Sequence, residues 1–204
     1  MSSPRRLRFV LRGNDVAEHE VKRFDEQALV DLARQGDQDA FAELVRIHQH
    51  EVYTLAARIV IDRDLAADVS QDAFVRAWRA MPRFRGDAQF STWMHRITVN
   101  TAFTHRERRK RRRAEPLETA GEPEAEGLSP ERAGDVAGMR DELERALASL
   151  PESLRAVVVL KDVYQWTHAE IGEQLEISVT AAKVRLHRGR KRLRDILWHM
   201  EEER

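Results

Sequence analysis

The chain has 204 residues, with 35 basic and 35 acidic side chains and no cysteine. The lack of cysteine excludes disulfides, thiol nucleophiles and cysteine-based zinc sites, and no run reaches the roughly 20 apolar residues that cross a membrane. The composition is typical of a charge-rich helical protein, and we expect it to be soluble and cytoplasmic. Residues 1–24 are predicted to form a short basic N-terminal extension.

The first helices are predicted from caps and from apolar side chains at helical spacing. Asp25 is expected to cap a helix that Gly36 ends, and Asp37 is expected to cap a longer one. Apolar side chains recur every three or four residues along the longer helix, at Phe41, Leu44, Val45, Val52, Leu55, Ala56 and Ile59. This stripe predicts a core-facing side. His48 lies on it and His50 on another face, so we expect no metal pair there.

A third helix is expected to begin at Asp62 or Asp64 and to stop at Pro82. Its apolar side faces the core with Val69, Ala73, Ala77 and Met81, and its acidic stripe consists of Asp64, Asp68 and Asp72 with Gln71 beside them. Carboxylates at four-residue steps share one face of a helix. A solvated surface is one interpretation. Because Phe74 and Trp78 are expected to be partly exposed nearby, we favour a docking face for a basic partner helix.

The next segment combines aromatic and polar groups in front of a basic run. Phe90, Trp93, Met94 and Ile97 are mostly core positions, whereas His95, Arg96 and Asn100 leave polar groups where a base edge can be read. The loop from Phe84 to Gln89 is a candidate rim for a flipped base, and seven basic residues against one acidic residue follow at 106–113. Stacking or burial of one base is worth about 1–3 kcal/mol. These residues therefore form a candidate surface for opening a nucleic-acid duplex.

Residues 114–138 are predicted to be a flexible acidic linker. They contain seven acidic residues, one arginine and three prolines, and almost no large apolar side chain. Such a segment cannot bury enough surface to fold alone. A soluble spacer and a segment that occupies a basic nucleic-acid channel are both compatible with this composition.

The last part of the chain, residues 139–200, is predicted to be helical and to contain a helix-turn-helix. Thr167 with Glu170 forms a capping box, and Ser178 is expected to cap a second helix after a tight connection. In the second helix Ala182, Leu186, Gly189 and Leu193 face inward, while the outward positions are Thr180, Ala181, Lys183, Val184, His187, Arg188, Lys191 and Arg194. We interpret this as a recognition helix rather than a solvated basic helix.

Two stretches resemble a known family. The first reads DVSQDAFVRAWRAMPRFRGDAQFSTWMHRITVNTA and is similar to region 2 of bacterial sigma factors of the extracytoplasmic-function group; the second reads LPESLRAVVVLKDVYQWTHAEIGEQLEISVTAAKVRLHRGRKRLR and is similar to their region 4. The resemblance implies an all-α protein with a region 2 domain at 25–113 and a region 4 domain at 139–200, joined by the linker.

The resemblance also implies a role for each candidate residue. Polymerase binding is expected at Asp64, Asp68, Gln71, Asp72, Phe74 and Trp78. Recognition and melting of the −10 promoter element are expected at Phe84, Arg85, Gly86, Asp87, His95, Arg96 and Asn100. Contacts with the −35 element as duplex are expected at Lys161, Thr180, Lys183, Val184, His187 and Arg188. Val184 cannot donate a hydrogen bond, so it suits an apolar contact with a thymine methyl group.

The implied partners are core RNA polymerase, through its β′ coiled coil and β flap, promoter DNA and an anti-sigma factor that is often membrane-bound. No cofactor, metal, catalytic residue, small-molecule substrate or membrane insertion is expected. A stand-alone helix-turn-helix regulator is the alternative function, but it does not explain the candidate base-binding features between Phe84 and Asn100. An enzyme acting on nucleic acid ranks last, because the sequence shows no carboxylate cluster with metal geometry and no glycine-rich phosphate loop.

Overall fold

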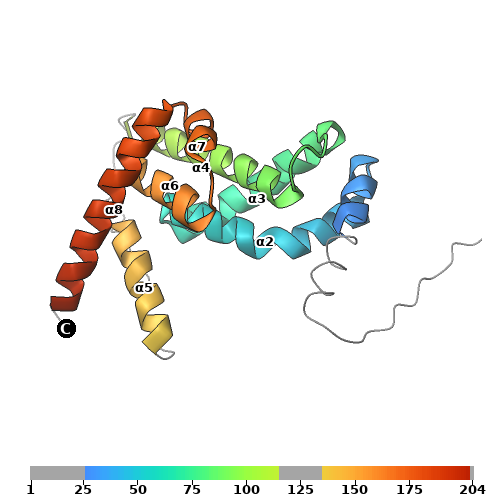
Figure 1. Ribbon diagram of the computed structural model, residues 1–204. Coiled ribbons are helices and arrows are strands. Elements are labelled where there is room, and N and C mark those ends of the chain that lie inside the picture. The colour runs from blue at the N-terminus through green and yellow to red at the C-terminus, as the bar shows by residue number, and fades with distance from the viewer. Residues whose placement is uncertain (1–25, 115–134, 203–204) are drawn as a thin grey trace, which may run out of the picture. The chain divides into compact units, whose positions relative to one another are not determined.

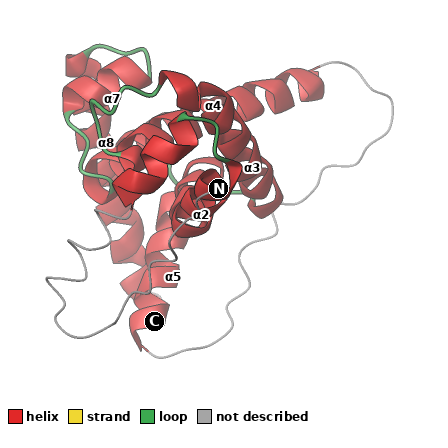
Figure 2. Cartoon of the chain, turned by 90° about the vertical axis from the view of Figure 1, so that its right-hand side faces the viewer, coloured by secondary structure: helices red, strands yellow, loops and turns green. Residues whose placement is uncertain are grey.

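The computed structural model describes residues 26–114 and 135–202. Within these ranges every regular element is a helix (Figures 1 and 2), which confirms the predicted all-α class. Residues 26–34 are helical. The elements that follow are α2 Gln38–Val60, α3 Arg63–Ala80, η1 Met81–Arg83, α4 Phe90–Ala114, α5 Asp135–Ala148, α6 Glu152–Val158, η2 Val159–Val163, α7 His168–Gln174 and α8 Val179–Glu202. The predictions for residues 1–24 and for residues 115–134 of the linker lie outside the described residues.

The helix boundaries follow local chemistry. Gly36 ends the first helical segment with φ +93°, a left-handed conformation that glycine adopts without steric cost. The Asp37 carboxylate then accepts the backbone N–H of Ala40 at 2.9 Å, and the Asp62 carboxylate accepts that of Leu65 at 2.9 Å. Both aspartates therefore cap the helices that were expected to begin there.

Two helices in the second half of the chain extend past the predicted bounds of the linker and of the last domain. α5 begins at Asp135, so residues 135–138 are helical rather than part of the linker. α8 continues to Glu202, two residues beyond the predicted end of the last domain. The composition of residues 114–138 does not reveal the first of these, because its turn-forming glycines and scarcity of large apolar side chains hide the start of a helix.

The chain divides into two compact units, and the division between them does not lie at the linker. Among the described residues, one unit consists of residues 26–47 together with Ala80–Arg85, and the other consists of His48–Arg79, residues 86–114 and residues 135–202. In the smaller unit the best-buried apolar side chains are those of Val30, Ala33, Leu44 and Met81. The larger unit contains the acidic stripe, α4 and the helix-turn-helix.

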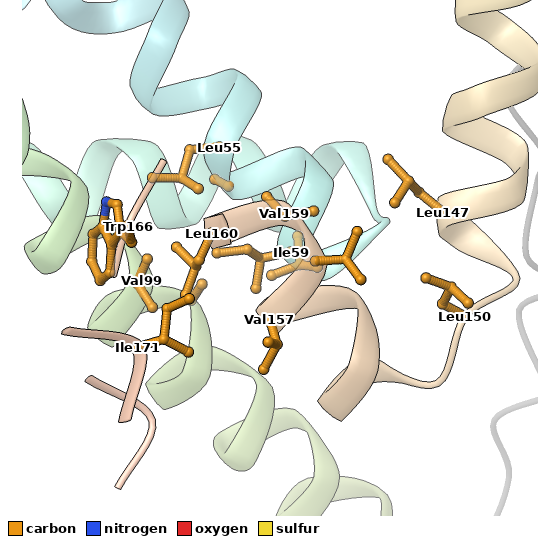
Figure 3. Packing of buried hydrophobic residues seen from close by; sticks show 14 of the residues in the cluster. Leu55, Ile59, Val99, Leu147, Leu150, Val157, Val159, Leu160, Trp166 and Ile171 are labelled. Atoms are coloured by element: carbon orange, nitrogen blue, oxygen red, sulfur yellow. The ribbon is translucent and has the colours of Figure 1, made fainter. Parts of the chain in front are cut away.

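A single hydrophobic cluster holds the larger unit together (Figure 3). It joins Leu55 and Ile59 of α2 and Val99 of α4 to Leu160 and to Ile171 of α7, and all five are at most 1 % exposed. Further members include Ala66, Val69, Ala102, Leu147, Leu150, Val157, Val158, Val159, Trp166, Ala182 and Leu186. Fully burying an Ile or Leu side chain stabilises a fold by about 1.5–3 kcal/mol. The helices on both sides of the linker thus share one core.

Candidate nucleic-acid interface

The helix-turn-helix is built from α7 and α8. The Thr167 hydroxyl accepts the backbone N–H of Glu170 at 3.2 Å, and the Glu170 carboxylate accepts the Thr167 backbone N–H at 2.8 Å. The Ser178 hydroxyl accepts the backbone N–H of Ala181 at 3.0 Å at the start of α8. The capping box and the second cap are both confirmed, and they fix where the two helices begin.

The turn between these helices is closed by a tight backbone contact. Ile177 donates its N–H to the Gly172 carbonyl at 2.9 Å, and Glu176 adopts φ +52°. A Cβ atom on Gly172 would lie 2.9 Å from the Ile177 carbonyl oxygen. Glycine is therefore required at position 172 because the backbone of the turn leaves no room for a side chain.

Gly172→Ala is expected to lower the free energy of unfolding by about 1 kcal/mol. The close contact costs about 1–3 kcal/mol, and the better helix propensity of alanine offsets up to about 1 kcal/mol of this. Urea unfolding followed by circular dichroism measures the change. Ala169→Gly at an exposed site of α7 is the control that changes propensity alone. A higher free energy of unfolding for Gly172→Ala would contradict the close contact between a Cβ atom at position 172 and the Ile177 carbonyl oxygen.

The outward face of α8 is open. Thr180, Lys183, Val184, His187 and Arg188 are all exposed, and Val184 retains 42 % of its surface. Ala182 and Leu186 are buried on the opposite side, as the helical spacing predicted. Five of the six residues expected at the −35 element therefore lie exposed on one helix.

The sixth residue, Lys161, lies outside the helix-turn-helix. It belongs to η2, it is half-buried, and its ammonium donates a hydrogen bond to the Trp166 carbonyl at 3.0 Å. An ammonium carries three donors, so this bond leaves two for another acceptor.

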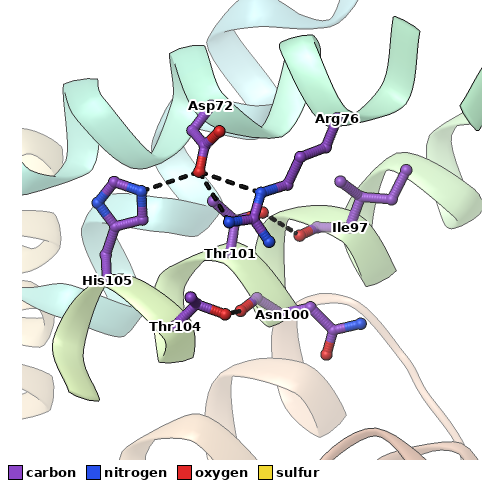
Figure 4. A network of polar contacts seen from close by, with 7 residues as sticks. All are labelled: Asp72, Arg76, Ile97, Asn100, Thr101, Thr104 and His105. Carbon is purple, nitrogen blue, oxygen red and sulfur yellow. Dashed lines mark hydrogen bonds and ion pairs between the residues drawn. The ribbon is translucent and has the colours of Figure 1, made fainter. Parts of the chain in front are cut away.

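The residues of the acidic stripe on α3 differ in their exposure to solvent. Asp64, Asp68 and Gln71 are exposed, whereas Asp72 is partly buried and engaged with other side chains (Figure 4). Its carboxylate lies 3.0 Å from Nε2 of His105 and accepts Nε–H of Arg76 at 3.0 Å. Burial tends to raise the pKa of Asp72, but His105 and Arg76 outweigh it and hold the pKa below its usual range. Asp72 thus anchors α4 to α3.

The expectation that Phe74 is partly exposed was wrong. Phe74 is 9 % exposed and lies among the buried residues of α3, while Trp78 is half-buried. Helical spacing explains the error, because position 74 lies next to the core positions 73 and 77 on the helix surface. The exposed part of the predicted polymerase-binding surface is therefore mainly acidic.

The loop before α4 divides into buried and exposed residues. Phe84 is 7 % exposed, so in this conformation its ring is not presented to a base. Arg85, Gly86 and Asp87 are exposed, and Gly86 adopts φ +79°. The polar part of the loop is therefore exposed to solvent, whereas its aromatic residue is not.

His95 is not presented to a ligand in this conformation. It is 7 % exposed, its Nε2 lies 2.9 Å from the Glu51 carboxylate, and its ring meets Tyr164 edge-on at 4.7 Å. Nδ1 of His48 lies 3.8 Å from the same carboxylate. The imidazoles of His48 and His95 hold the pKa of Glu51 well below its usual range. Sequence spacing indicated the face of α4 but not this partner, which lies on α2.

Glu51→Gln is expected to remove stability that depends on pH. Because the pKa of Glu51 is lowered by folding, its charge stabilises the fold above the ordinary glutamate pKa of about 4.3, and this contribution is lost as the pH falls toward the folded pKa. At pH 7 the free energy of unfolding of wild type is expected to exceed that of Glu51→Gln by on the order of 1 kcal/mol. Urea unfolding between pH 7 and 3 is expected to show the two proteins converging.

Glu173→Gln, at an exposed site of α7, is the matched control for this pH series. It is expected to follow wild type throughout. A constant difference between wild type and Glu51→Gln from pH 7 to pH 3 would contradict the role of the Glu51 charge.

Arg96 and Asn100 lie on the side of α4 that meets α7. Gln174 of α7 donates to the Asn100 side-chain oxygen at 2.6 Å and to the Arg96 carbonyl at 3.2 Å. The Arg96 guanidinium lies 3.5 Å from the Glu170 carboxylate and 6.0 Å from the centre of the Trp166 ring. Asn100 remains exposed and Arg96 half-exposed. Both side chains are thus partly accessible to solvent, and both also contact polar side chains of α7.

Comparisons with known proteins follow the same division of the chain. Residues 44–112 match the family model for Sigma-70 region 2, and residues 140–193 match that for Sigma-70 region 4. The RNA polymerase sigma-H factor of Pseudomonas aeruginosa is 36 % identical over 178 residues, which cover 81 % of this chain and 90 % of that protein. The ECF RNA polymerase sigma factor SigW of Bacillus subtilis is 34 % identical over 169 residues, covering 79 % of this chain and 90 % of that protein.

The chain belongs to the extracytoplasmic-function group of sigma factors. A solved structure of CnrH in complex with the cytosolic domain of CnrY is also similar to it. That likeness has 28 % sequence identity and a TM-score of 0.56, and it covers 85 % of this chain and 97 % of CnrH. The resemblance seen in the two sequence stretches is therefore confirmed at the level of the family.

In this sigma factor region 2 spans most of α2 and all of α3, and it ends within α4; region 4 spans most of α5 to α8. Sequence reasoning missed Gln174 and Arg155, which tie the two regions together. Their partners on the other region lie 74 to 96 residues away in the sequence, so no local spacing could have revealed them. Among the described residues no helix is long and apolar enough to cross a membrane, and no cluster of three His, Asp or Glu side chains could hold a metal ion.

Proposed function

We propose that this sigma factor binds core RNA polymerase, directs it to promoters through −35 and −10 elements, and promotes melting of the DNA around the start site. The observation that carries the proposal is the α8 face. Thr180, Lys183, Val184, His187 and Arg188 are exposed together on the second helix of a fully capped helix-turn-helix. A helix presented in this way fits the major groove of duplex DNA.

Polymerase binding is assigned to the acidic surface of α3. The exposed residues Asp64, Asp68 and Gln71 form its accessible part, and Asp72 and Trp78 lie at its partly buried edge. Acidic side chains in a row steer a basic partner and fix its register. We assign Phe74 a packing role beneath this surface, because its ring is buried.

Reading of the −10 element is assigned to the polar residues that the structure leaves accessible. These are Arg85, Gly86 and Asp87 in the loop and Arg96 and Asn100 on α4. An exposed amide can read a base edge, and a guanidinium can stack on a base or hold a phosphate. Phe84 and His95 are buried in the observed conformation, so neither is assigned a base contact there.

The sigma factor is also proposed to be controlled by a protein that binds it, the anti-sigma factor that its resemblance to the group implied. The similar chain CnrH was solved in complex with the cytosolic domain of CnrY. This relationship supports a protein partner of the same kind for the present chain.

Permanganate footprinting with core RNA polymerase tests the proposed function. Promoter fragments are first selected from a genomic library by the reconstituted holoenzyme. Addition of the sigma factor to core polymerase is expected to make thymines near the start site reactive, because unpaired thymines are accessible to oxidation. Fragments that stay unreactive with the holoenzyme, despite stable binding, would contradict the melting role.

Asn100→Ala is expected to reduce open-complex formation at these promoters by about tenfold, which corresponds to the roughly 1–3 kcal/mol that a base contact contributes. Assembly with core polymerase is expected to stay within twofold of wild type. Glu107→Ala, at an exposed position of α4, is the control. Equal losses of open complex and of polymerase binding would argue against a base-reading role for Asn100.

A further inference from the structure

We propose that a polar hollow in the smaller unit binds one unpaired nucleotide of melted promoter DNA. The inference rests on the proposed function and adds a nucleotide site to it. The hollow has a volume of about 400 Å³ and is lined by Asp31, Arg34, Gln35 and Pro82. None of these residues is among those expected at the −10 or −35 element, and three of them precede the stretch that matches Sigma-70 region 2.

The backbone around the hollow is held in place by buried side chains. One side belongs to the helical segment 26–34 and the turn after it, and this segment packs on the core through Val30 and Ala33, at 3 % and 1 % exposure. The other side is Pro82 of η1, which follows the fully buried Met81. A proline ring also fixes its own φ. A ligand therefore meets a largely formed site, which lowers the entropy cost of binding.

Two side chains of the hollow can hold the faces of an unstacked base. The Arg34 guanidinium is exposed and lies 3.6 Å from the Asp31 carboxylate, so it moderates the negative charge of that carboxylate. A guanidinium plane stacks on a base, and the exposed ring of Pro82 adds an apolar surface. These two groups suit any base, whatever its identity.

The other two side chains can bind the edge of a base. Gln35 donates its Nε2–H to the Asp31 backbone carbonyl at 3.1 Å, which leaves its side-chain oxygen as an acceptor. The Asp31 carboxylate accepts Nε2–H of Gln27 at 3.4 Å and keeps further lone pairs. Both groups are acceptors, so they suit a base with an exocyclic amino group, which thymine lacks. The site is therefore expected to prefer cytosine, adenine or guanine.

The position of the hollow in the chain favours a nucleotide over a protein segment. Pro82 lies three residues before Arg85 of the loop assigned to the −10 element, a distance of at most about 11 Å along the chain. Arg83 and Arg85 are both exposed, and cations along a groove hold the phosphates of a single strand. A strand that contacts this loop therefore continues within reach of the hollow.

Site-directed photo-cross-linking in the holoenzyme tests the site. The chain has no cysteine, so Gln35→Cys carries a single benzophenone maleimide when it is labelled before assembly with core polymerase. In open complexes at selected promoters, the label is expected to attach to one unpaired nucleotide, which primer extension maps. Ala42→Cys, at an exposed site of the same unit, is the control. Attachment to polymerase alone, or no more attachment to DNA than with Ala42→Cys, would overturn the proposal.

Arg34→Ala tests whether this nucleotide is bound or only close. An abasic site at the mapped position is expected to shorten the lifetime of the wild-type open complex about tenfold. Arg34→Ala is expected to shorten it about tenfold on intact DNA, with less than about twofold further loss on abasic DNA. Arg46→Ala removes another exposed cation of the same unit and is expected to follow wild type. Equal abasic losses in wild type and Arg34→Ala would contradict stacking on Arg34.

The same complexes test the expected base preference and keep the two proposals separate. Thymine at the mapped position is expected to shorten the wild-type lifetime about threefold relative to cytosine, and equal lifetimes would contradict contacts to the base edge. If the wild-type holoenzyme melts no selected promoter, the proposed function fails and the nucleotide site fails with it. If it melts them but Gln35→Cys labels no unpaired nucleotide, only the nucleotide site fails.

Discussion

Replacing Asp64 and Asp68 together by lysine is expected to abolish co-purification with core RNA polymerase. Both carboxylates are exposed on α3, so the protein itself gains little from them and its folding is expected to be unaffected. Reversal turns attraction for a basic partner into repulsion, and like charges facing each other at an interface cost several kcal/mol. A cost of about 4 kcal/mol lowers an affinity roughly 1,000-fold.

Asp72 is excluded from this variant because it holds His105 and Arg76. Substitution there would confound loss of binding with loss of packing between α3 and α4. Asp39→Lys with Glu173→Lys changes two exposed carboxylates elsewhere and shifts the net charge equally. Retention of polymerase by the Asp64 and Asp68 variant would show that the acidic stripe is only solvated surface.

Arg155→Ala is expected to lower the free energy of unfolding by about 3 kcal/mol. The guanidinium donates to the Leu150 carbonyl at 3.1 Å and to the Ile59 carbonyl at 3.0 Å. Removing it leaves these buried acceptors unsatisfied, at about 1–3 kcal/mol each. Burial lowers the pKa of Arg155 to about 10, so the side chain is charged at neutral pH. Urea unfolding at pH 7 measures the loss.

Arg190→Ala is the matched control for this substitution. Arg190 also pairs with a side chain in region 4, Asp162, but more than half of its own side chain is exposed. An exposed ion pair contributes less than about 1 kcal/mol, so the control is expected to unfold near the wild-type midpoint. Equal losses of unfolding free energy in the two variants would contradict the conclusion that the buried hydrogen bonds of Arg155 stabilise the fold more than the exposed ion pair of Arg190.

The helix caps and the buried sides of the helices could be predicted from the sequence. Asp37, Asp62 and Ser178 cap helices because each places a short acceptor side chain within reach of a free N–H. The core side of α3 and the inward side of α8 followed from helical spacing alone. The family resemblance added roles to the exposed residues, and the match to both sigma regions confirmed the family.

The contacts between residues far apart in the sequence could not be predicted from it. Spacing placed His95 on a polar face of α4, but it could not show that Glu51 of α2 and Tyr164 would bury its ring. It also could not show that Gln174 would meet Asn100, because that pairing depends on how region 4 packs against region 2. Phe74 illustrates the same limit within one helix, since a side chain at the edge of an apolar stripe is buried or exposed according to its neighbours.

In vitro transcription tests the central claim most directly. Purified core RNA polymerase is incubated with a library of promoter fragments, with and without this protein, and the transcripts are sequenced. The account predicts initiation that depends on both components, from fragments that share two short motifs. Absence of initiation, together with polymerase-independent binding to duplex DNA, would contradict it and would favour a stand-alone regulator.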